Sequence, residues 1–211
     1  MTRMLTLFAA AALAMAGCDE SASAGKRKYR IALVPKMLNN PVFNCGKIAA
    51  EKTRAEIEAK ENVSIEILWS GPSRSNPAEQ AQIVQSFAHQ KVDGISVSVD
   101  EAATLRKAID AAAEKGVPVM TFDSDSPDSR RRVFFGTDDV ECGEALARHL
   151  GGLVKKGKIV IQSGTAAPNL QKRVDGAKAY LAKHFPGITV DNVIFCNDDT
   201  KEAIDDIASY T

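Results

Sequence analysis

Short runs of β-branched and apolar residues alternate along this chain with longer stretches of amphipathic pattern. The runs IALV, ISVSV, VPVMTF and KIVIQS are mostly apolar rather than alternating, which is typical of strands covered by helices on both faces. Strands that alternate with helices in this way form parallel, doubly wound sheets with right-handed crossovers. We therefore predict an α/β fold.

The hydrophobic period and the turn residues set the limits of the expected elements. We predict strands at 30–34, 63–69, 94–99, 117–122, 133–136, 158–162 and 192–195. We predict helices at 41–59, 77–90, 101–115, 140–155, 168–184 and 201–209. Ligands bind at the carboxyl ends of the strands in such sheets, so the residues that follow each strand are the candidates for a site.

The loops after these strands are polar and rich in Asn, Asp and Ser. They contain neither of the Gly-rich phosphate-binding motifs, GxGxxG and GxxxxGK[ST], and no GxSxG nucleophile elbow. The three histidines fall in predicted helices and form no cluster with cysteines, so we expect no metal site and no cofactor.

Charge and composition narrow the class of protein. Lys and Arg together number 27, as do Asp and Glu, so the formal net charge is zero. A nucleic-acid-binding protein needs a basic surplus to neutralise phosphates, and we expect no nucleic-acid partner. Four cysteines in 211 residues are too few for a disulfide scaffold. The chain is expected to be an ordinary globular protein.

The first residues have the pattern of an export signal. Arg3 precedes the uncharged apolar run Met4–Ala16, which is shorter than the roughly 20 residues that span a bilayer. The run ends in Ala-Gly-Cys, which resembles the lipobox of bacterial lipoproteins. We expect a lipoprotein signal peptide at 1–17, and a lipidated Cys18 with a flexible tether at 18–28. The alternative is a simple signal peptide followed by a chance cysteine.

Four segments at strand ends carry a family resemblance when they are taken in order. They are the loop 35–43 after the first strand, the segment 116–125, the crossover 135–139, and the segment 163–176. From about Tyr29 onward the chain resembles the type I periplasmic solute-binding proteins of sugar uptake systems.

This resemblance implies a two-lobed fold in which each lobe is a doubly wound parallel sheet. The first ligand-binding lobe is expected at 29–134 and a partial second lobe at 135–211. Family members are longer, so we expect the second lobe to be incomplete. The resemblance also implies a binding protein rather than an enzyme. It would be membrane-anchored at the periplasmic face of the cell envelope, with an ABC permease or a chemosensory membrane protein as its partner.

The resemblance further implies which residues contact the ligand, a monosaccharide or related polyol. Ionised Asp accepts strong hydrogen bonds from hydroxyls, Asn and Lys donate them, and an aromatic ring covers the apolar face of a sugar. The expected ligand-binding residues are Lys36, Asn40, Phe43, Trp69, Asp123, Asp138, Asn169 and Arg173.

Each of these residues also has a purely structural interpretation. The alternatives are a helix cap for Asn40 and Asp138, a place in the core for Phe43, solvation for Lys36, packing under a loop for Trp69, and an ion pair with Asp175 for Arg173.

Departures from the family pattern leave the ligand's identity open. Ribose-type members often have Arg where this chain has Ser124, and a second aromatic where it has Val42. Lys36, the segment 69–72 and the segment 123–125 instead resemble the branch that includes rhamnose and autoinducer-2 receptors. The Asp-Gln pair of that branch is Asn169-Leu170 here. We therefore expect a small polyhydroxylated ligand without naming a sugar.

An enzyme is the alternative from another class. Asp123 and Asp125 have the D-x-D spacing of haloacid-dehalogenase-type phosphatases, in which the first Asp is the nucleophile and the second a general acid. Ser163 would bind phosphate, and Asp198 with Asp199 would hold Mg²⁺. In that family the nucleophile strand opens the domain, whereas three strand–helix units precede Asp123 here.

Overall fold

The computed structural model describes residues 25–210. The expected signal peptide at 1–17 and Cys18 lie outside the described residues. The elements follow one another in the order β1 (Arg27–Val34), α1 (Pro41–Lys60), β2 (Val63–Trp69), α2 (Pro77–His89), β3 (Gly94–Val97), α3 (Ala102–Glu114), β4 (Val119–Phe122), β5 (Val133–Phe135), α4 (Asp139–Val154), β6 (Gly157–Ser163), α5 (Pro168–His184), β7 (Ile188–Phe195) and α6 (Thr200–Ala208).

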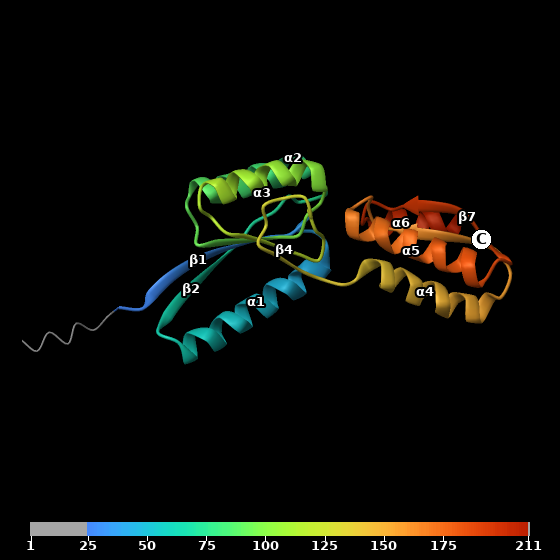
Figure 1. The fold of residues 1–211 in the computed structure, drawn as a ribbon, viewed down its shortest axis with the longest axis horizontal. Coiled ribbons are helices and arrows are strands. Elements are labelled where there is room, and N and C mark those ends of the chain that lie inside the picture. Colours follow the sequence, from blue (N-terminus) through green and yellow to red (C-terminus); the bar gives the residue numbers. More distant parts are fainter. Residues whose placement is uncertain (1–24, 211) are drawn as a thin grey trace, which may run out of the picture.

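The first lobe is built on a five-stranded parallel sheet of order β2-β1-β3-β4-β5. Helix α1 covers one face of the sheet and helices α2 and α3 cover the other (Figure 1). The buried core lies where α2 and α3 meet β1, β3 and β4, with Val34, Val97 and Ile109 fully buried. The predicted doubly wound sheet is therefore present in this lobe.

The second lobe pairs β6 and β7 in parallel, with α4 and α5 packed against each other beside them (Figure 1). The two helices approach closely at Gly143 and Gly176. A Cβ added to Gly143 would lie 2.0 Å from the carbonyl oxygen of Arg173, and one on Gly176 would lie 2.4 Å from that of Val140. Glycine at both positions is what allows this crossing.

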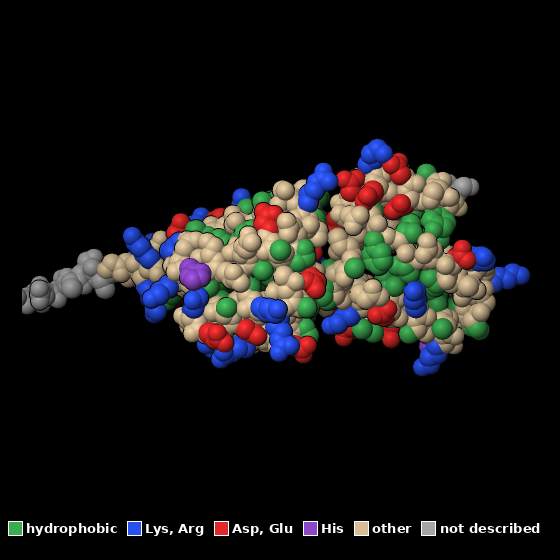
Figure 2. All heavy atoms as spheres, turned by 90° about the horizontal axis from the view of Figure 1, so that it is seen from above, with side chains coloured by type: hydrophobic (Ala, Val, Ile, Leu, Met, Phe, Trp, Pro, Cys, Tyr) green, Lys and Arg blue, Asp and Glu red, His purple; other side chains and the backbone are tan. Residues whose placement is uncertain are grey.

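An apolar cavity of about 550 Å³ lies in the second lobe between α4, α5 and β6. Leu146 and Leu153 of α4 line it and remain exposed, and hydrophobic side chains are visible on this part of the surface (Figure 2). It extends to the end of β6 at Ser163 and Gly164, and Arg173, one of the expected ligand-binding residues, is part of its lining. None of the helices within residues 25–210 is long and apolar enough to cross a membrane.

Two strands begin earlier than their sequence pattern predicts. Strand β1 starts at Arg27, where it pairs with Val63, so residues 27 and 28 belong to the sheet and not to the tether expected at 18–28. Strand β7 starts at Ile188, four residues before its predicted start. Asp191 interrupts the apolar pattern there because it occupies an irregularity in the pairing with β6.

The boundary between the lobes also differs slightly from the expected one. Strand β5 is a fifth strand of the first sheet, and Phe135 pairs in it with Phe122. The first sheet therefore ends at Phe135 rather than at residue 134, and the crossover to α4 occupies residues 136–138.

Candidate functional site

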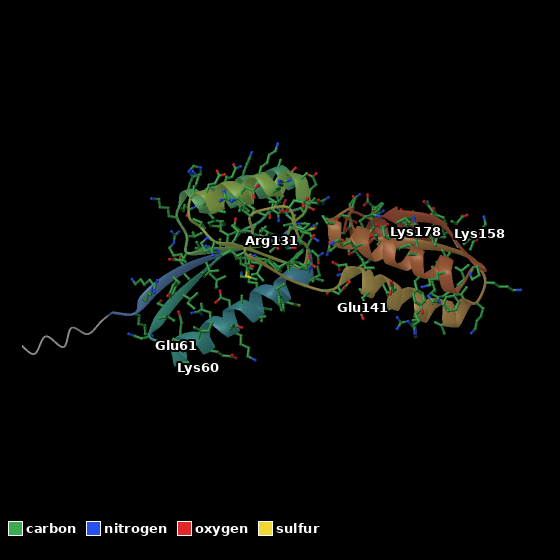
Figure 3. All side chains as sticks on the ribbon, in the orientation of Figure 1. Lys60, Glu61, Arg131, Glu141, Lys158 and Lys178 are labelled. Carbon is green, nitrogen blue, oxygen red and sulfur yellow. The ribbon has the colours of Figure 1, made fainter. Side chains whose placement is uncertain are left out.

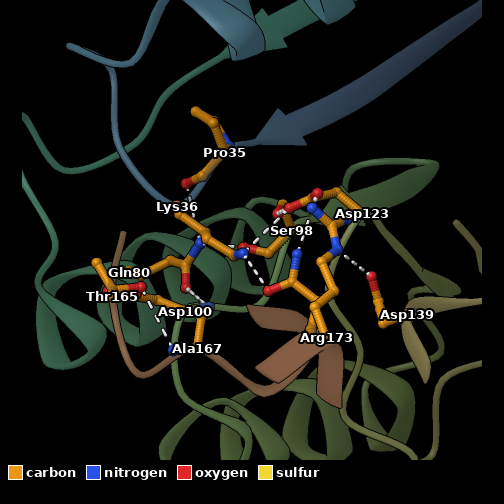
Figure 4. A network of polar contacts seen from close by, with 11 residues as sticks. Pro35, Lys36, Gln80, Ser98, Asp100, Asp123, Asp139, Thr165, Ala167 and Arg173 are labelled. Carbon is orange, nitrogen blue, oxygen red and sulfur yellow. Dashed lines mark hydrogen bonds and ion pairs between the residues drawn. The ribbon is translucent and has the colours of Figure 1, made fainter. Parts of the chain in front are cut away.

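Three of the predicted site residues meet at the carboxyl ends of the first sheet (Figure 4). The Nζ atom of Lys36, which follows β1, lies 3.1 Å from Oδ2 of Asp123, which follows β4. Asn169, in the first turn of α5, accepts a hydrogen bond from Lys36 Nζ at 2.9 Å. Its Nδ2 donates to Oδ1 of Asp123 at 3.3 Å. One amide from the second lobe thus bridges both members of an ion pair in the first lobe.

Burial makes this cluster electrostatically strong. Lys36 and Asn169 are each 4% exposed. A buried ammonium group is tolerated only when it is paired and hydrogen-bonded, and here both requirements are met within the cluster. The hydroxyl of Ser98, which follows β3, also donates to Asp123 Oδ2 at 2.7 Å. The ends of β1, β3 and β4 therefore contribute to one polar group.

The backbone at the site has an uncommon conformation. Asp123 has φ +59°, in the left-handed region, and so do Asn197 and Asp198 after β7, with φ +51° and +55°. Short polar side chains such as Asp and Asn tolerate this region better than other non-glycine residues. Such residues cluster at functional sites when the surrounding structure holds them in place.

A further buried carboxylate, Asp100, lies three residues beyond the end of β3 and is missing from the predicted site. It is 5% exposed and accepts a hydrogen bond from the Ser75 hydroxyl at 2.8 Å. Burial raises the pKa of Asp100, and the nearby negative charge of Asp198 adds to that rise, while Ser75 and Lys36 oppose it. The strand-end rule that selects Asp123 applies equally to Asp100.

Other predicted site residues have structural roles in this conformation. Asn40 caps α1 by accepting from the backbone N–H of Val42 at 3.0 Å. The exposed Asp138 caps α4 by accepting from Glu141 at 3.1 Å. Phe43 is 7% exposed, and its ring meets that of Phe122 edge-on, with centroids 6.5 Å apart. The capping and core alternatives describe these three side chains.

Trp69 and Arg173 each contact a neighbour that the sequence did not indicate. The ammonium group of Lys47 lies 5.9 Å from the centre of the half-buried Trp69 ring. Arg173 pairs with the buried Asp139 at 2.8 Å, and not with Asp175 as the structural alternative had it. The ion pair lies beside the Lys36 cluster (Figure 4). Asp139 was missed because it lies at the start of a helix rather than at a strand end.

Asp125, the second carboxylate of the phosphatase motif, forms an ion pair with Arg131. Arg131, which Figure 3 places in the first lobe, donates from Nη2 to Oδ2 of Asp125 at 2.7 Å. Burial alone would raise the pKa of Asp125, but hydrogen bonds from Arg131 and Thr121 hold it below its usual value. A general acid needs the opposite shift, because it must carry a proton near neutral pH.

Polar cavities between the lobes flank the cluster. One of about 240 Å³ is lined by Asp125 and Phe134 from the first lobe and by Asn169 and Lys172 from the second. Another of about 410 Å³ includes Arg74 on one side and residues of α6 on the other. A ligand between the lobes would therefore contact side chains from both.

Comparisons with known proteins agree with this architecture. A family profile described as a periplasmic binding protein domain matches residues 31–210. The chain is 27% identical over 142 residues to the ribose import binding protein of Bacillus subtilis, covering 67% of this chain. It is 31% identical over 163 residues to a xylitol-binding protein of Mycolicibacterium smegmatis, covering 74% of this chain. It spans 44% of the length of each of these relatives.

Solved structures show the same fold. A solute-binding protein of Burkholderia graminis in complex with D-arabinose superposes with a TM-score of 0.76 at 30% identity, covering 88% of this chain and 62% of that one. A glucose-galactose binding protein of Geobacillus stearothermophilus gives 0.78 at 26% identity, covering 87% and 64%. These matches lend no support to the phosphatase alternative, and the chain belongs to the periplasmic binding protein family.

Proposed function

We propose that this chain is the ligand-binding part of a protein that captures a monosaccharide or similar polyol for an ABC transporter. The observation that carries the proposal is the ion pair between the buried Lys36 and the half-buried Asp123, which Asn169 bridges from the other lobe. Lys36 and Asp123 follow strands of the first sheet and Asn169 reaches them from the other lobe, so the cluster lies where ligands bind in open α/β sheets.

The chemistry of the cluster suits a neutral hydroxylated ligand. A hydroxyl group both donates and accepts, so it can donate to the Asp123 carboxylate while accepting from the Lys36 ammonium. The amide of Asn169 does the same with its two ends in the present conformation. A sugar hydroxyl inserted between the lobes would replace these contacts without leaving a buried charge unpaired.

The relatives support this class of ligand. Their printed names refer to ribose, xylitol, D-arabinose, and glucose with galactose, all of which are neutral and polyhydroxylated. Lobes that close over such a ligand remove it from water and strengthen each hydrogen bond. The transport partner would be an ABC permease, or in a sensory role a chemosensory membrane protein.

Calorimetric titration tests the proposal. The chain from residue 19 onward would be titrated with D-ribose, D-arabinose, xylitol, D-glucose and D-galactose, and we expect heat of saturable binding with at least one. Hydrolysis of a generic phosphate ester that requires Mg²⁺ and Asp123, without sugar binding, would contradict it.

Asp123→Asn should weaken that binding by about 10-fold or more, since a hydrogen bond to a charged group contributes about 1.5–3 kcal/mol. The variant keeps the shape of the side chain but removes the charge that faces Lys36. Asp128→Asn, in an exposed turn of the same loop region, is the matched control and should bind as the wild type does. Equal affinity in both variants would remove Asp123 from the site.

We also propose that Cys18 is lipidated and holds the protein at the periplasmic face of the cell envelope. The full chain expressed in a bacterial host should incorporate a labelled fatty acid and sediment with membranes. Cys18→Ser should abolish the label and release the protein to the soluble fraction. Retention of the label in Cys18→Ser would exclude this site of attachment.

A further inference from the structure

Gln80 is a fully buried polar side chain in the first turn of α2, with 0% of its surface exposed. Its Nε2 donates to the carbonyl oxygen of Pro35 at 2.9 Å and to that of Ser98 at 2.7 Å. Its Oε1 accepts from the backbone N–H of Asp100 at 3.0 Å. The side-chain amide of Gln80 thus forms three hydrogen bonds, all with backbone groups that follow the neighbouring strands β1 and β3 (Figure 4).

These bonds begin where the pairing of the two strands ends. Strands β1 and β3 pair in register up to Val34 and Val97, and the N–H of Ser98 still donates to the Val34 carbonyl at 2.9 Å. The residue that follows β1 is Pro35, which has no backbone N–H group and so cannot donate a hydrogen bond to β3. Beyond this point the Gln80 amide takes over the role of the sheet hydrogen bonds.

The strand ends that Gln80 fixes are those that carry the ligand-site cluster. Lys36 follows Pro35 directly, and the Ser98 hydroxyl donates to Asp123. Asp100, whose N–H binds Gln80, is the buried carboxylate beside Lys36. A shift of either strand end would therefore move a member of the cluster.

We propose that Gln80 is a positioning residue for the site, because it sets the spacing of the β1 and β3 ends and thereby the geometry of the Lys36–Asp123–Asn169 cluster. It does so without contacting the ligand. A primary amide is suited to this task because one group supplies two donors and an acceptor, whereas a carboxylate supplies no donor and Met supplies neither. The effect on affinity rests on the proposed function, but the effect on the cluster does not.

The test compares three variants of α2. Gln80→Met removes the amide while keeping a side chain of similar length. Val84→Ala, at a position with 0% exposure on the same helix, removes buried apolar atoms and leaves the hydrogen bonds of Gln80 in place. Gln82→Met, at an exposed position, controls for the loss of an amide on this helix. Each variant is measured for its Tm and by nitrogen–proton NMR without ligand.

We expect Gln80→Met to shift the side-chain amide resonances of Asn169 and to speed hydrogen exchange of the Asp100 N–H by at least tenfold. Val84→Ala and Gln82→Met should leave both signals unchanged, even where Val84→Ala lowers the Tm as much. Unchanged signals in Gln80→Met, or the same changes in Val84→Ala, would overturn the proposal. If Gln80→Met does not fold, Gln80→Asn keeps the amide but is too short for all three bonds, and its signals should shift in the same way.

Affinity provides the second measurement. With the sugar that binds the wild type in the titrations above, Gln80→Met should bind at least fivefold more weakly, and Val84→Ala should bind normally. If none of those sugars binds the wild type, the proposed function fails while the NMR comparison still decides the role of Gln80.

Discussion

Individual charged residues at strand ends and in the helices beside them form the buried ion pairs of this molecule. Lys36 is paired with Asp123, and Arg173 with Asp139, whereas the buried Asp100 accepts a hydrogen bond from the uncharged Ser75 hydroxyl. Burial raises the pKa of Asp100, so its ionised form is disfavoured in the folded protein.

The raised pKa of Asp100 predicts a pH-dependent effect of Asp100→Asn. The unfolded carboxyl has a pKa of about 3.9, so between that pH and the higher folded value the native state holds more protons and its stability falls as pH rises. The penalty is complete once the pH lies above the folded pKa. Asp100→Asn should therefore raise the Tm at pH 7, by roughly 2–4 °C for each kcal/mol gained, and lose that advantage below about pH 4.

Thermal unfolding of both proteins between pH 3.5 and pH 8 measures this difference. Asp128→Asn, at an exposed position, should show no such trend. A destabilisation by Asp100→Asn that is the same at both ends of the range would show that the carboxyl is needed for its hydrogen bonds rather than strained by burial.

Some residues of the candidate site can be predicted from the sequence and others cannot. Lys36 and Asp123 were predicted from their place directly after apolar strands, a rule that depends only on local pattern. Gln80 and Asp139 lie inside or at the start of helices, where an amphipathic pattern treats any polar residue as solvent-facing. Their burial depends on which helix face the sheet covers, and that is a tertiary property.

At the scale of elements, the helices lie within about two residues of their predicted limits because caps and prolines mark them. Asn40 with Pro41 opens α1, and Asn76 with Pro77 opens α2. The early start of β7 was missed because Asp191 and Asn192 resemble a turn in sequence. The pairing with β6 accommodates them through an irregularity that no local pattern reveals.

The crossing of α4 and α5 gives a prediction for two glycines of one helix. Gly143→Ala should destabilise the second lobe by about 1–3 kcal/mol, because the added Cβ would meet the Arg173 carbonyl at 2.0 Å and force the helices apart. Gly152→Ala, at an open position of α4, should instead stabilise it by about 0.5–1 kcal/mol. Urea unfolding of both variants measures the contrast, and equal effects would refute the close crossing.

The whole molecule consists of two lobes held together across the cluster. The chain passes from the first sheet to α4 through residues 136–138 (Figure 1), while Asn169 reaches back from α5 to Lys36 and Asp123. The family resemblance predicted the lobes. It could not predict that the expected ligand-binding groups would bind one another, since that depends on the relative placement of segments more than 130 residues apart.

Asn169→Ala should change the distribution of lobe orientations in the protein without ligand. The variant loses both hydrogen bonds to the ion pair, so the lobes should separate more often. Small-angle X-ray scattering should record a larger radius of gyration than in wild type, and Lys178→Ala on the exposed side of the same helix should not differ from wild type. An unchanged radius in Asn169→Ala would show that other contacts keep the lobes together.

The left-handed backbone of Asp123 restricts which substitutions this protein could accept at that position. Few residues other than Gly, Asn and Asp accept a φ of +59° without strain, so most replacements at this position would disturb the loop before they altered any contact with a sugar. Changes in ligand preference would then arise more readily from substitutions of the side chains around Asp123 than from substitution of Asp123 itself. A library that randomises Asp123 should yield few folded clones.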